Sequence, residues 1–162
     1  MQHIFINASN IHIGGGKVIL EDLISATRSY KKITFIVYVD YRLKFNSYFE
    51  GNVIIKKIKK YQRFLVYFYI ESSAKENDIV IYLNNIPPVL KHKCKTFLVQ
   101  SNRFVIDKFP LSGFSFKTKI RIIAERLFFL INKGNSDYII VQSYSMFLAL
   151  EKNGISKKKI LI

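Results

Sequence analysis

The run from Ile33 to Val39 constrains the fold most strongly. It reads Ile-Thr-Phe-Ile-Val-Tyr-Val, with Lys31 and Lys32 before it and Asp40 after it. β-branched and aromatic residues favour a strand, and an almost unbroken apolar run indicates a strand that is covered on both faces. Such strands belong to parallel sheets with helices packed on each side, so we expect an α/β protein.

Similar apolar runs alternate with helix-compatible segments along the rest of the chain. We expect strands at residues 3–6, 33–39, 53–55, 78–83, 96–100 and 136–142, with a last strand beginning at 160. We expect helices at residues 18–29, 60–74, 117–133 and 143–153; the second is aromatic and β-branched enough for a strand to be the alternative. The chain has 162 residues, 49% of them hydrophobic. We therefore predict a single Rossmann-like domain, residues 1–162, around a doubly wound, mostly parallel sheet of six or seven strands.

The segment 117–133 has apolar residues at helical spacing, interrupted by Glu125 and two arginines. This spacing predicts an amphipathic helix on the surface of the sheet, ended by Gly134. Its apolar residues are expected to face inward, namely Ile120, Ile123, Leu127, Leu130 and Ile131. The preceding segment, 105–116, is expected to be irregular, with exposed phenylalanines at positions 109, 114 and 116.

Three consecutive glycines, Gly14, Gly15 and Gly16, lie between the first strand and the first helix, with Lys17 directly after them. Glycine lets the backbone approach a ligand closely, and a helix start presents unpaired N–H groups. This corner therefore suits a phosphate or a sugar. It matches neither the dinucleotide fingerprint G-x-G-x-x-G nor the phosphate loop G-x-x-x-x-G-K-[ST]. A tight turn where the helix packs on the strand is the alternative interpretation.

Polar residues also follow two later strands. Asn84 and Asn85 come after the strand at 78–83, before two prolines, and Ser101 and Asn102 come after the strand at 96–100. Open α/β sheets bind ligands at the carboxyl ends of their strands, so these four residues are candidate substrate contacts. Ordinary turn chemistry is the alternative. Ser143 is a candidate helix cap and, at the same edge, a further candidate contact.

The chain is strongly basic, with 26 Lys and Arg against 11 Asp and Glu and a formal net charge of +15. Polyanions and anionic lipid surfaces are natural partners for such a charge. The basic run 56–60 precedes the aromatic segment 61–70, a pattern that nucleic-acid and membrane binders share. We favour a solvated lysine cluster that leads into a core-packed helix, because the aromatic residues lie inside an apolar run.

The sequence does not contain the residue patterns that several kinds of chemistry require. Cys94 is the single cysteine, so no internal disulfide is expected, and His3, His12 and His92 are too scattered for a metal site. There is no G-x-S-x-G nucleophile motif. No signal peptide is evident, and the longest apolar run, 64–70, is far shorter than the ~20 residues of a transmembrane helix. We expect a cytoplasmic protein that binds and positions a ligand.

Taken together, these segments resemble the N-terminal half of a GT-B-fold glycosyltransferase of the family 4 type, which builds bacterial surface polysaccharides. Four segments carry the resemblance: Asn7 to Lys17, Asp78 to Pro88, Thr96 to Asn102, and the strand Asp137-Tyr138-Ile139-Ile140-Val141-Gln142 with Ser143 and the helix behind it. The resemblance implies an acceptor-binding domain of a hexosyltransferase-type enzyme. The donor would be a nucleotide-sugar, which is a substrate, and no cofactor is implied.

In that family a C-terminal domain holds the nucleotide-sugar and carries an E-x7-E motif, which this chain lacks. The resemblance therefore implies an incomplete, inactive half that works with a C-terminal domain or a partner chain. It places Gly14, Gly15 and Gly16 near the donor diphosphate, with Asn10, His12 and Lys17 beside them. Gln100-Ser101-Asn102 stand where the family often has a catalytic histidine, so no catalytic residue is assigned.

The implied acceptor is a glycan or a lipid-linked sugar. A lipid-linked acceptor would bring the protein to the inner face of the membrane, where residues 56–60 and the phenylalanines at 109–116 could contact anionic lipid. The alternatives are a basic nucleic-acid-binding module, with nucleic acid the less favoured partner, and a stand-alone nucleotide- or phosphate-binding domain. A receiver-like domain ranks lowest, because its metal would depend on Asp40, Asp78 and Asp107 alone.

Overall fold

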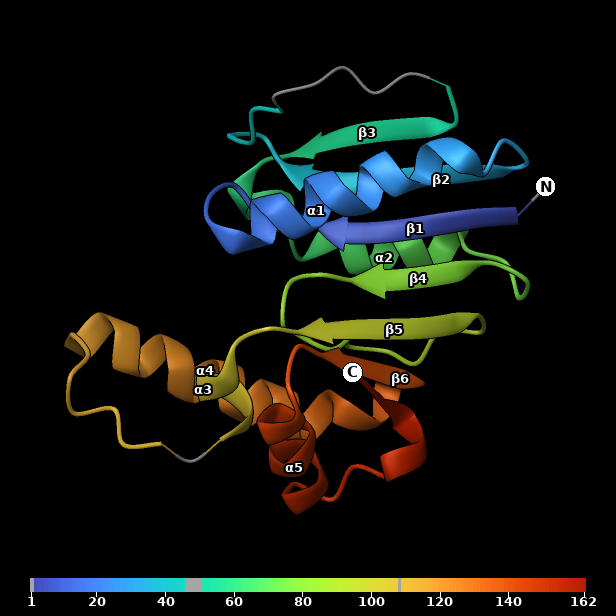
Figure 1. Ribbon diagram of the computed structural model, residues 1–162. Helices are drawn as coiled ribbons and strands as arrows, with labels where there is room; N and C mark the ends of the chain where they lie inside the picture. The colour runs from blue at the N-terminus through green and yellow to red at the C-terminus, as the bar shows by residue number, and fades with distance from the viewer. Residues whose placement is uncertain (1, 46–50, 108) are drawn as a thin grey trace.

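A computed structural model describes residues 2–45, 51–107 and 109–162. The described residues form one sheet of seven strands in the order β3-β2-β1-β4-β5-β6-β7, shown in Figure 1. Every neighbouring pair is parallel. The strands are β1 (Gln2–Ala8), β2 (Ile33–Asp40), β3 (Val53–Ile58), β4 (Ile79–Tyr82), β5 (Lys95–Gln100), β6 (Tyr138–Val141) and β7 (Ile160–Leu161).

Helices connect most of these strands. The α-helices are α1 (Gly15–Ala26), α2 (Leu65–Ser73), α3 (Arg103–Ile106), α4 (Phe116–Asn132) and α5 (Tyr144–Lys152). Short 3-10 turns are η1 (Thr27–Ser29), η2 (Lys60–Gln62), η3 (Lys133–Asn135) and η4 (Lys157–Lys159). Three helices begin with a side-chain cap, in which Asn102, Ser115 or Ser143 accepts a backbone N–H from the first turn. Of the helices in the described ranges, none combines the length and apolarity needed to cross a bilayer.

The two faces of the sheet are covered differently. On one face, Leu20 and Ile24 of α1 pack against Ile6 and Val37 of the central strands. On the other face, buried residues of α2, α3, α4 and α5 form a second cluster, with Phe129 among the fully buried side chains. Burying one large apolar side chain contributes about 1.5–3 kcal/mol, so both clusters stabilise the sheet substantially.

The order of the strands reverses between β1 and β4. From β1 the chain moves outward to β2 and β3, returns through α2 to β4, and then moves outward in the other direction to β7. The loops after β1 and β4 therefore leave the sheet on opposite sides and open a crevice at its carboxyl edge. In open α/β sheets this reversal point is where ligands bind.

The predicted fold class is confirmed. The sheet is α/β, doubly wound and Rossmann-like, as expected for the N-terminal half of a GT-B fold, and it is parallel throughout with seven strands. The strand alternative for the segment 60–74 is wrong, because η2 and α2 occupy it. The first helix begins at Gly15 and not at Val18, so two of the three glycines lie in its first turn.

Lys56 and Lys57 are part of β3, which runs beyond the predicted end at Ile55 to Ile58. Parallel pairing with β2 decides this, since Lys56 is aligned with Tyr38 and its ammonium lies 5.3 Å from the centre of that ring. Lysine is common on edge strands, where its charge discourages pairing with another chain. The basic run is therefore divided between a strand and η2.

Helix α4 faces the sheet with a side that differs from the predicted one. Ile122 and Phe129 are its buried residues. The five residues expected to face inward are all exposed, namely Ile120, Ile123, Leu127, Leu130 and Ile131. The helix is apolar on two sides, so its spacing alone did not identify the buried one. The segment before it is also more regular than predicted, because α3 occupies residues 103–106 and Phe116 already belongs to α4.

Candidate functional site

A cavity of about 400 Å³ opens at the point where the strand order reverses. Its walls come from the loops after β1 and β4 and from helices α2 and α4. We call this cavity the switch-point pocket. Its polar residues are Ser9, Asn10, Arg63, Tyr67, Asn84 and Glu125, and the rest of its lining is apolar. An apolar pocket with a few converging polar groups is the usual form of a small-molecule site.

A buried carboxylate organises one side of the pocket. Asp40, the last residue of β2, is completely buried and accepts hydrogen bonds from the Arg42 backbone N–H (2.9 Å), Arg42 Nε (2.9 Å) and Arg42 Nη2 (3.0 Å). Arg63 Nη2 donates to Oδ2, the carboxylate oxygen that also accepts from Arg42 Nη2. The Arg42 side chain, helped by Arg63, holds the pKa of Asp40 well below its usual range. Asp40 is therefore ionised at neutral pH and fixes both guanidinium groups.

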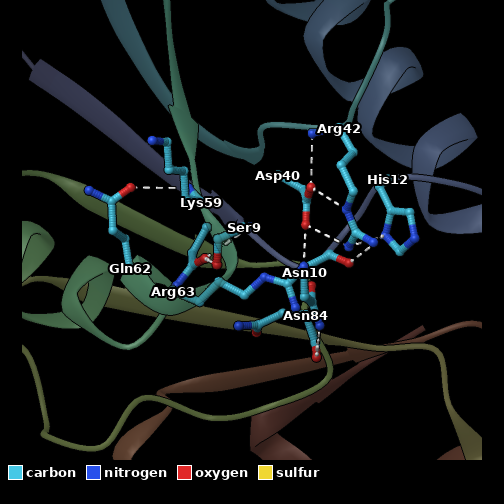
Figure 2. A network of polar contacts seen from close by, with 10 residues as sticks. Ser9, Asn10, His12, Asp40, Arg42, Lys59, Gln62, Arg63 and Asn84 are labelled. Atoms are coloured by element: carbon cyan, nitrogen blue, oxygen red, sulfur yellow. Dashed lines mark hydrogen bonds and ion pairs between the residues drawn. The ribbon is translucent and has the colours of Figure 1, made fainter.

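The loop after β1 is tied to its neighbours on both sides, as Figure 2 shows. Asn10 Nδ2 donates to the Asn84 carbonyl oxygen at 3.3 Å, which links the ends of β1 and β4. His12 Nδ1 lies 3.4 Å from Arg42 Nη2, which links the loop to the end of β2. Because a guanidinium only donates, His12 Nδ1 is the acceptor in that contact. These links bring three strand ends together.

Two polar atoms at the pocket have no protein partner among the described residues. They are Asn10 Oδ1 and Arg63 Nε, both buried within the wall. Leaving a buried donor or acceptor unpaired costs about 1–3 kcal/mol, so most such groups are paired. Because both atoms lie beneath the surface of the pocket, a hydroxyl group in the pocket would reach them only after the wall rearranges.

Aromatic stacking supports the pocket from below. Tyr67 Oη accepts a hydrogen bond from Asn84 Nδ2 at 3.1 Å, and its ring stacks on Tyr82 at 5.4 Å. Tyr82 Oη lies 2.6 Å from His92 Nε2, and His92 Nδ1 pairs with Glu71. Burial raises the pKa of Tyr67 to about 12, so its phenol is neutral at physiological pH.

Glu125 is the acidic residue of the pocket wall. It projects from α4, and burial raises the pKa of its carboxyl group, with a smaller opposing effect from Arg121. Arg121 Nε lies 3.6 Å from Glu125 Oε1, one helical turn away. A carboxylate in a partly apolar site can accept a proton from a bound hydroxyl more readily than an exposed one.

Of the predicted substrate contacts, the structure places Asn10 and Asn84 in the switch-point pocket. The turn formed by Gly14, Gly15 and Gly16, which we call the glycine corner, lies outside this pocket. Gly14 precedes α1 with φ 72° and ψ −160°, and Gly15 and Gly16 begin the helix. Lys17 Nζ lies 3.6 Å from Glu21 Oε1 on the next turn of α1.

The other predicted contacts have structural partners. Asn85 Oδ1 accepts hydrogen bonds from the Ser101 N–H (2.6 Å), Ser101 Oγ (2.9 Å) and the Asn102 N–H (2.9 Å), so these three residues join the ends of β4 and β5. Asn85 has a φ of 61°, which asparagine tolerates better than most residues. Ser143 caps α5, as predicted.

Sequence reasoning missed several residues of the site. Arg63 and Tyr67 lie in an aromatic segment that the sequence assigned to core packing, and Glu125 was noted only as an interruption of a helix. Ser9 directly follows β1 and Asp40 is the last residue of β2, and this position at a strand end is the signal that could have identified them. The carboxylates considered for a metal lie apart, since Asp78 binds backbone N–H groups of His3 and Lys75 and Asp107 pairs with Arg103. In the described ranges, no three metal-ligating side chains gather.

No protein-family model matches the chain, and no curated protein matches its sequence. Solved structures do match its fold. The apo form of the lipopolysaccharide outer core galactosyltransferase WaaB aligns with 100% of this chain and 45% of its own, with a TM-score of 0.51 and 14% identity. HepE from Anabaena, solved in complex with UDP, aligns with 99% of this chain and 43% of its own, with a TM-score of 0.49 and 13% identity. This chain therefore spans less than half the length of either protein.

Proposed function

We propose that this chain is the acceptor-binding domain of a glycosyltransferase. The observation that carries the proposal is the switch-point pocket, which combines converging polar side chains, an apolar lining and a carboxyl group at the carboxyl edge of a Rossmann-like sheet. The fold shared with the galactosyltransferase WaaB supports it. The acceptor would be a glycan or a lipid-linked sugar of a surface polysaccharide.

The proposed reaction needs a second domain, in the same polypeptide or in a partner chain, that holds the nucleotide-sugar. The bond between the anomeric carbon of the donor and its diphosphate breaks, and an acceptor hydroxyl oxygen bonds to that carbon. The hydroxyl proton leaves to a base, and the diphosphate leaves as an anion. Closing the two domains over the pocket would exclude water from the reacting atoms.

Each wall of the pocket has a proposed role. Asn10 and Asn84 hydrogen-bond hydroxyl groups of the acceptor, and Arg63 supplies a further donor. Glu125 accepts a hydrogen bond from the attacking hydroxyl, which its raised pKa favours. The lining from α2 and α4 excludes water around the sugar.

The glycine corner is proposed to face the donor. The first backbone N–H groups of α1, at Gly15 and Gly16, suit a diphosphate oxygen because a helix start favours negative charge. His12 and Lys17 stand on either side of these glycines in the sequence. In this arrangement the corner and the pocket bind the two substrates separately.

Amide-resolved NMR titration of the ¹⁵N-labelled chain tests the proposal. Acceptor-type oligosaccharides should shift the amides of residues 9–10, 84–86 and 124–125, and Asn84→Ala should reduce those shifts. Lys31→Ala, at the opposite edge of the sheet, is the matched control. Shifts confined to residues outside the pocket, or no shifts with any glycan tested, would overturn acceptor binding.

A second candidate is polyanion binding at the amino edge of the sheet. A depression of about 500 Å³ there is lined by five lysines against two acids, Glu76 and Asp137. The lysines are Lys91, Lys93, Lys95, Lys158 and Lys159. Nucleic acid bound by these charges would lose affinity steeply with salt. Filter binding of generic DNA and RNA at two salt concentrations distinguishes this candidate from glycan binding.

A further inference from the structure

Helix α4 exposes a continuous apolar stripe. It consists of Phe116, Ile120, Ile123, Leu127, Leu130 and Ile131, whose exposed fractions lie between 43% and 80%. Steps of three and four residues place all six on one side of the helix, away from the buried Ile122 and Phe129. Contiguous exposed apolar surface on a helix marks a docking site more often than chance exposure does.

The stripe lies beside the switch-point pocket. Ala124 and Phe128 of the same helix line the pocket and alternate in sequence with stripe residues. On the other wall, Phe64 lines the pocket and is exposed, and Leu65 and Phe68 beside it are exposed as well. Both helices that frame the pocket therefore carry exposed apolar side chains next to it.

The projecting end of α4 adds aromatic residues and positive charge. In Figure 1 the first turns of this helix extend beyond the carboxyl ends of the strands. Arg126 Nε and Nη2 donate to the Phe104 and Phe109 carbonyl oxygens, at 2.7 Å and 3.0 Å, which holds the segment before α4 against the helix. The helix itself contains Lys117, Lys119, Arg121 and Arg126 against one acid, Glu125.

We propose that the α4 stripe is the surface by which this protein binds an anionic lipid bilayer, with α4 lying in the plane of the interface. An apolar stripe on a helix whose polar positions are basic is the pattern of interfacial helices. The excess of positive charge complements anionic headgroups and disfavours a second copy of this chain, whose net charge is also +15.

This surface shares Phe116 with the membrane contact expected from sequence but otherwise differs from it. Lys56 and Lys57 lie on β3, at the edge of the sheet farthest from β6 and β7. The segment before α4 is held to that helix through Arg126. Lys56 and Lys57 therefore lie at a different part of the molecule from these phenylalanines. The stripe on α4 joins apolar surface and basic charge on one element, and it places the pocket close to the lipid.

Flotation of the 162-residue chain with lipid vesicles tests the inference. Vesicles of equal parts phosphatidylglycerol and phosphatidylcholine should carry the protein, with weaker binding at high salt and little binding to phosphatidylcholine alone. Ile123→Ser should weaken binding about fivefold. Ile54→Ser on β3 is a matched control, because both isoleucines are 48% exposed, and it should bind like the wild type. Circular dichroism confirms that both variants are folded.

Two double variants that lose the same charge separate the electrostatic contribution of α4 from the effect of net charge. The double variant Lys117→Gln, Lys119→Gln should bind anionic vesicles more weakly than Lys31→Gln, Lys32→Gln, although both lose the same charge. Equal loss in the two double variants would show that only net charge acts and would overturn the stripe as the docking surface.

Two further outcomes would also overturn the inference. One is failure of the wild type to float with any vesicle. The other is a dimer in sedimentation experiments that Ile123→Ser converts to a monomer, which would make a second copy the occupant of the stripe. The vesicle assay contains no sugar, so it can fail while glycan binding succeeds, and the reverse.

Discussion

The glycine corner and the switch-point pocket lie at the same edge of the sheet but are built differently. The corner offers only main-chain atoms. Gly14 and Gly15 are exposed, and a Cβ atom added at either would meet no other atom within 4 Å. The pocket is made of side chains from four separate segments, held by a completely buried carboxylate. The corner is therefore continuous in sequence, whereas the pocket exists only after β1, β2 and β4 have come together.

This difference indicates where each region is vulnerable. Substitutions in the pocket should act through charge and hydrogen bonding, because ion pairs and hydrogen bonds hold its polar side chains in place. Substitutions in the corner should act through backbone conformation alone. The following predictions test that division, beginning with the largest effect.

Replacing the buried carboxylate should have the largest effect. Asp40→Ala should lower the free energy of unfolding by about 3 kcal/mol, because it leaves Arg42 and Arg63 without their shared partner. Urea unfolding measures the change. Asp107→Ala is the control, since its pair with Arg103 is exposed and should contribute less than about 1 kcal/mol. Equal losses in the two variants would contradict a special role for Asp40.

The contribution of Asp40 to the free energy of unfolding should also decrease at low pH. Its pKa in the folded protein lies below the value of 3.8 that an unperturbed aspartate has. Its stabilisation is therefore complete above about pH 4 and is lost as the pH falls further, because the unfolded chain then binds a proton that the folded one does not. The stability gap between the wild type and Asp40→Asn should narrow below pH 4. A gap that stays constant down to pH 2.5 would contradict this.

Within the corner, the three glycines should differ from one another. Gly14 has positive φ with extended ψ, a conformation that is almost restricted to glycine. Gly14→Ala should therefore lower the free energy of unfolding by about 2 kcal/mol. Gly15→Ala should be neutral or stabilising by about 0.5 kcal/mol, because Gly15 is helical and has space for a Cβ atom. Thermal unfolding of the two variants gives the comparison, and equal effects would mean that backbone conformation is not what the corner requires.

The smallest expected effect concerns a single hydrogen bond of the pocket. Tyr67→Phe keeps the stacking on Tyr82 but removes the acceptor of Asn84 Nδ2. It should lower stability by about 1 kcal/mol and also weaken binding of acceptor-type glycans, as measured by titration calorimetry. Tyr69→Phe, an exposed position on the same helix, is the control. Unchanged glycan affinity in Tyr67→Phe would show that Asn84 does not need the hydrogen bond to Tyr67 in order to bind a glycan.

Helix α4 illustrates how far pattern reasoning reaches. Its existence and its approximate ends were predicted from spacing, because apolar residues recur every three or four positions. Its orientation was not, because Ile122 and Phe129 form a second apolar side that the same spacing permits. The choice between the two sides depends on which one fits the groove left by neighbouring elements, and that groove is a property of the assembled sheet.

The sequence by itself determined the fold class, the positions of the strands and the capping of α5 by Ser143, because burial on both faces and local hydrogen bonding are recorded in neighbouring residues. It also placed Asn84 at the carboxyl end of a strand, and the family resemblance named Asn10 beside the glycines. Only the tertiary structure decided that these two residues share a pocket with Arg63 and Glu125. The reason is physical: parallel strands joined by helices bring together residues that are far apart in the chain, and no local pattern records which loops will meet.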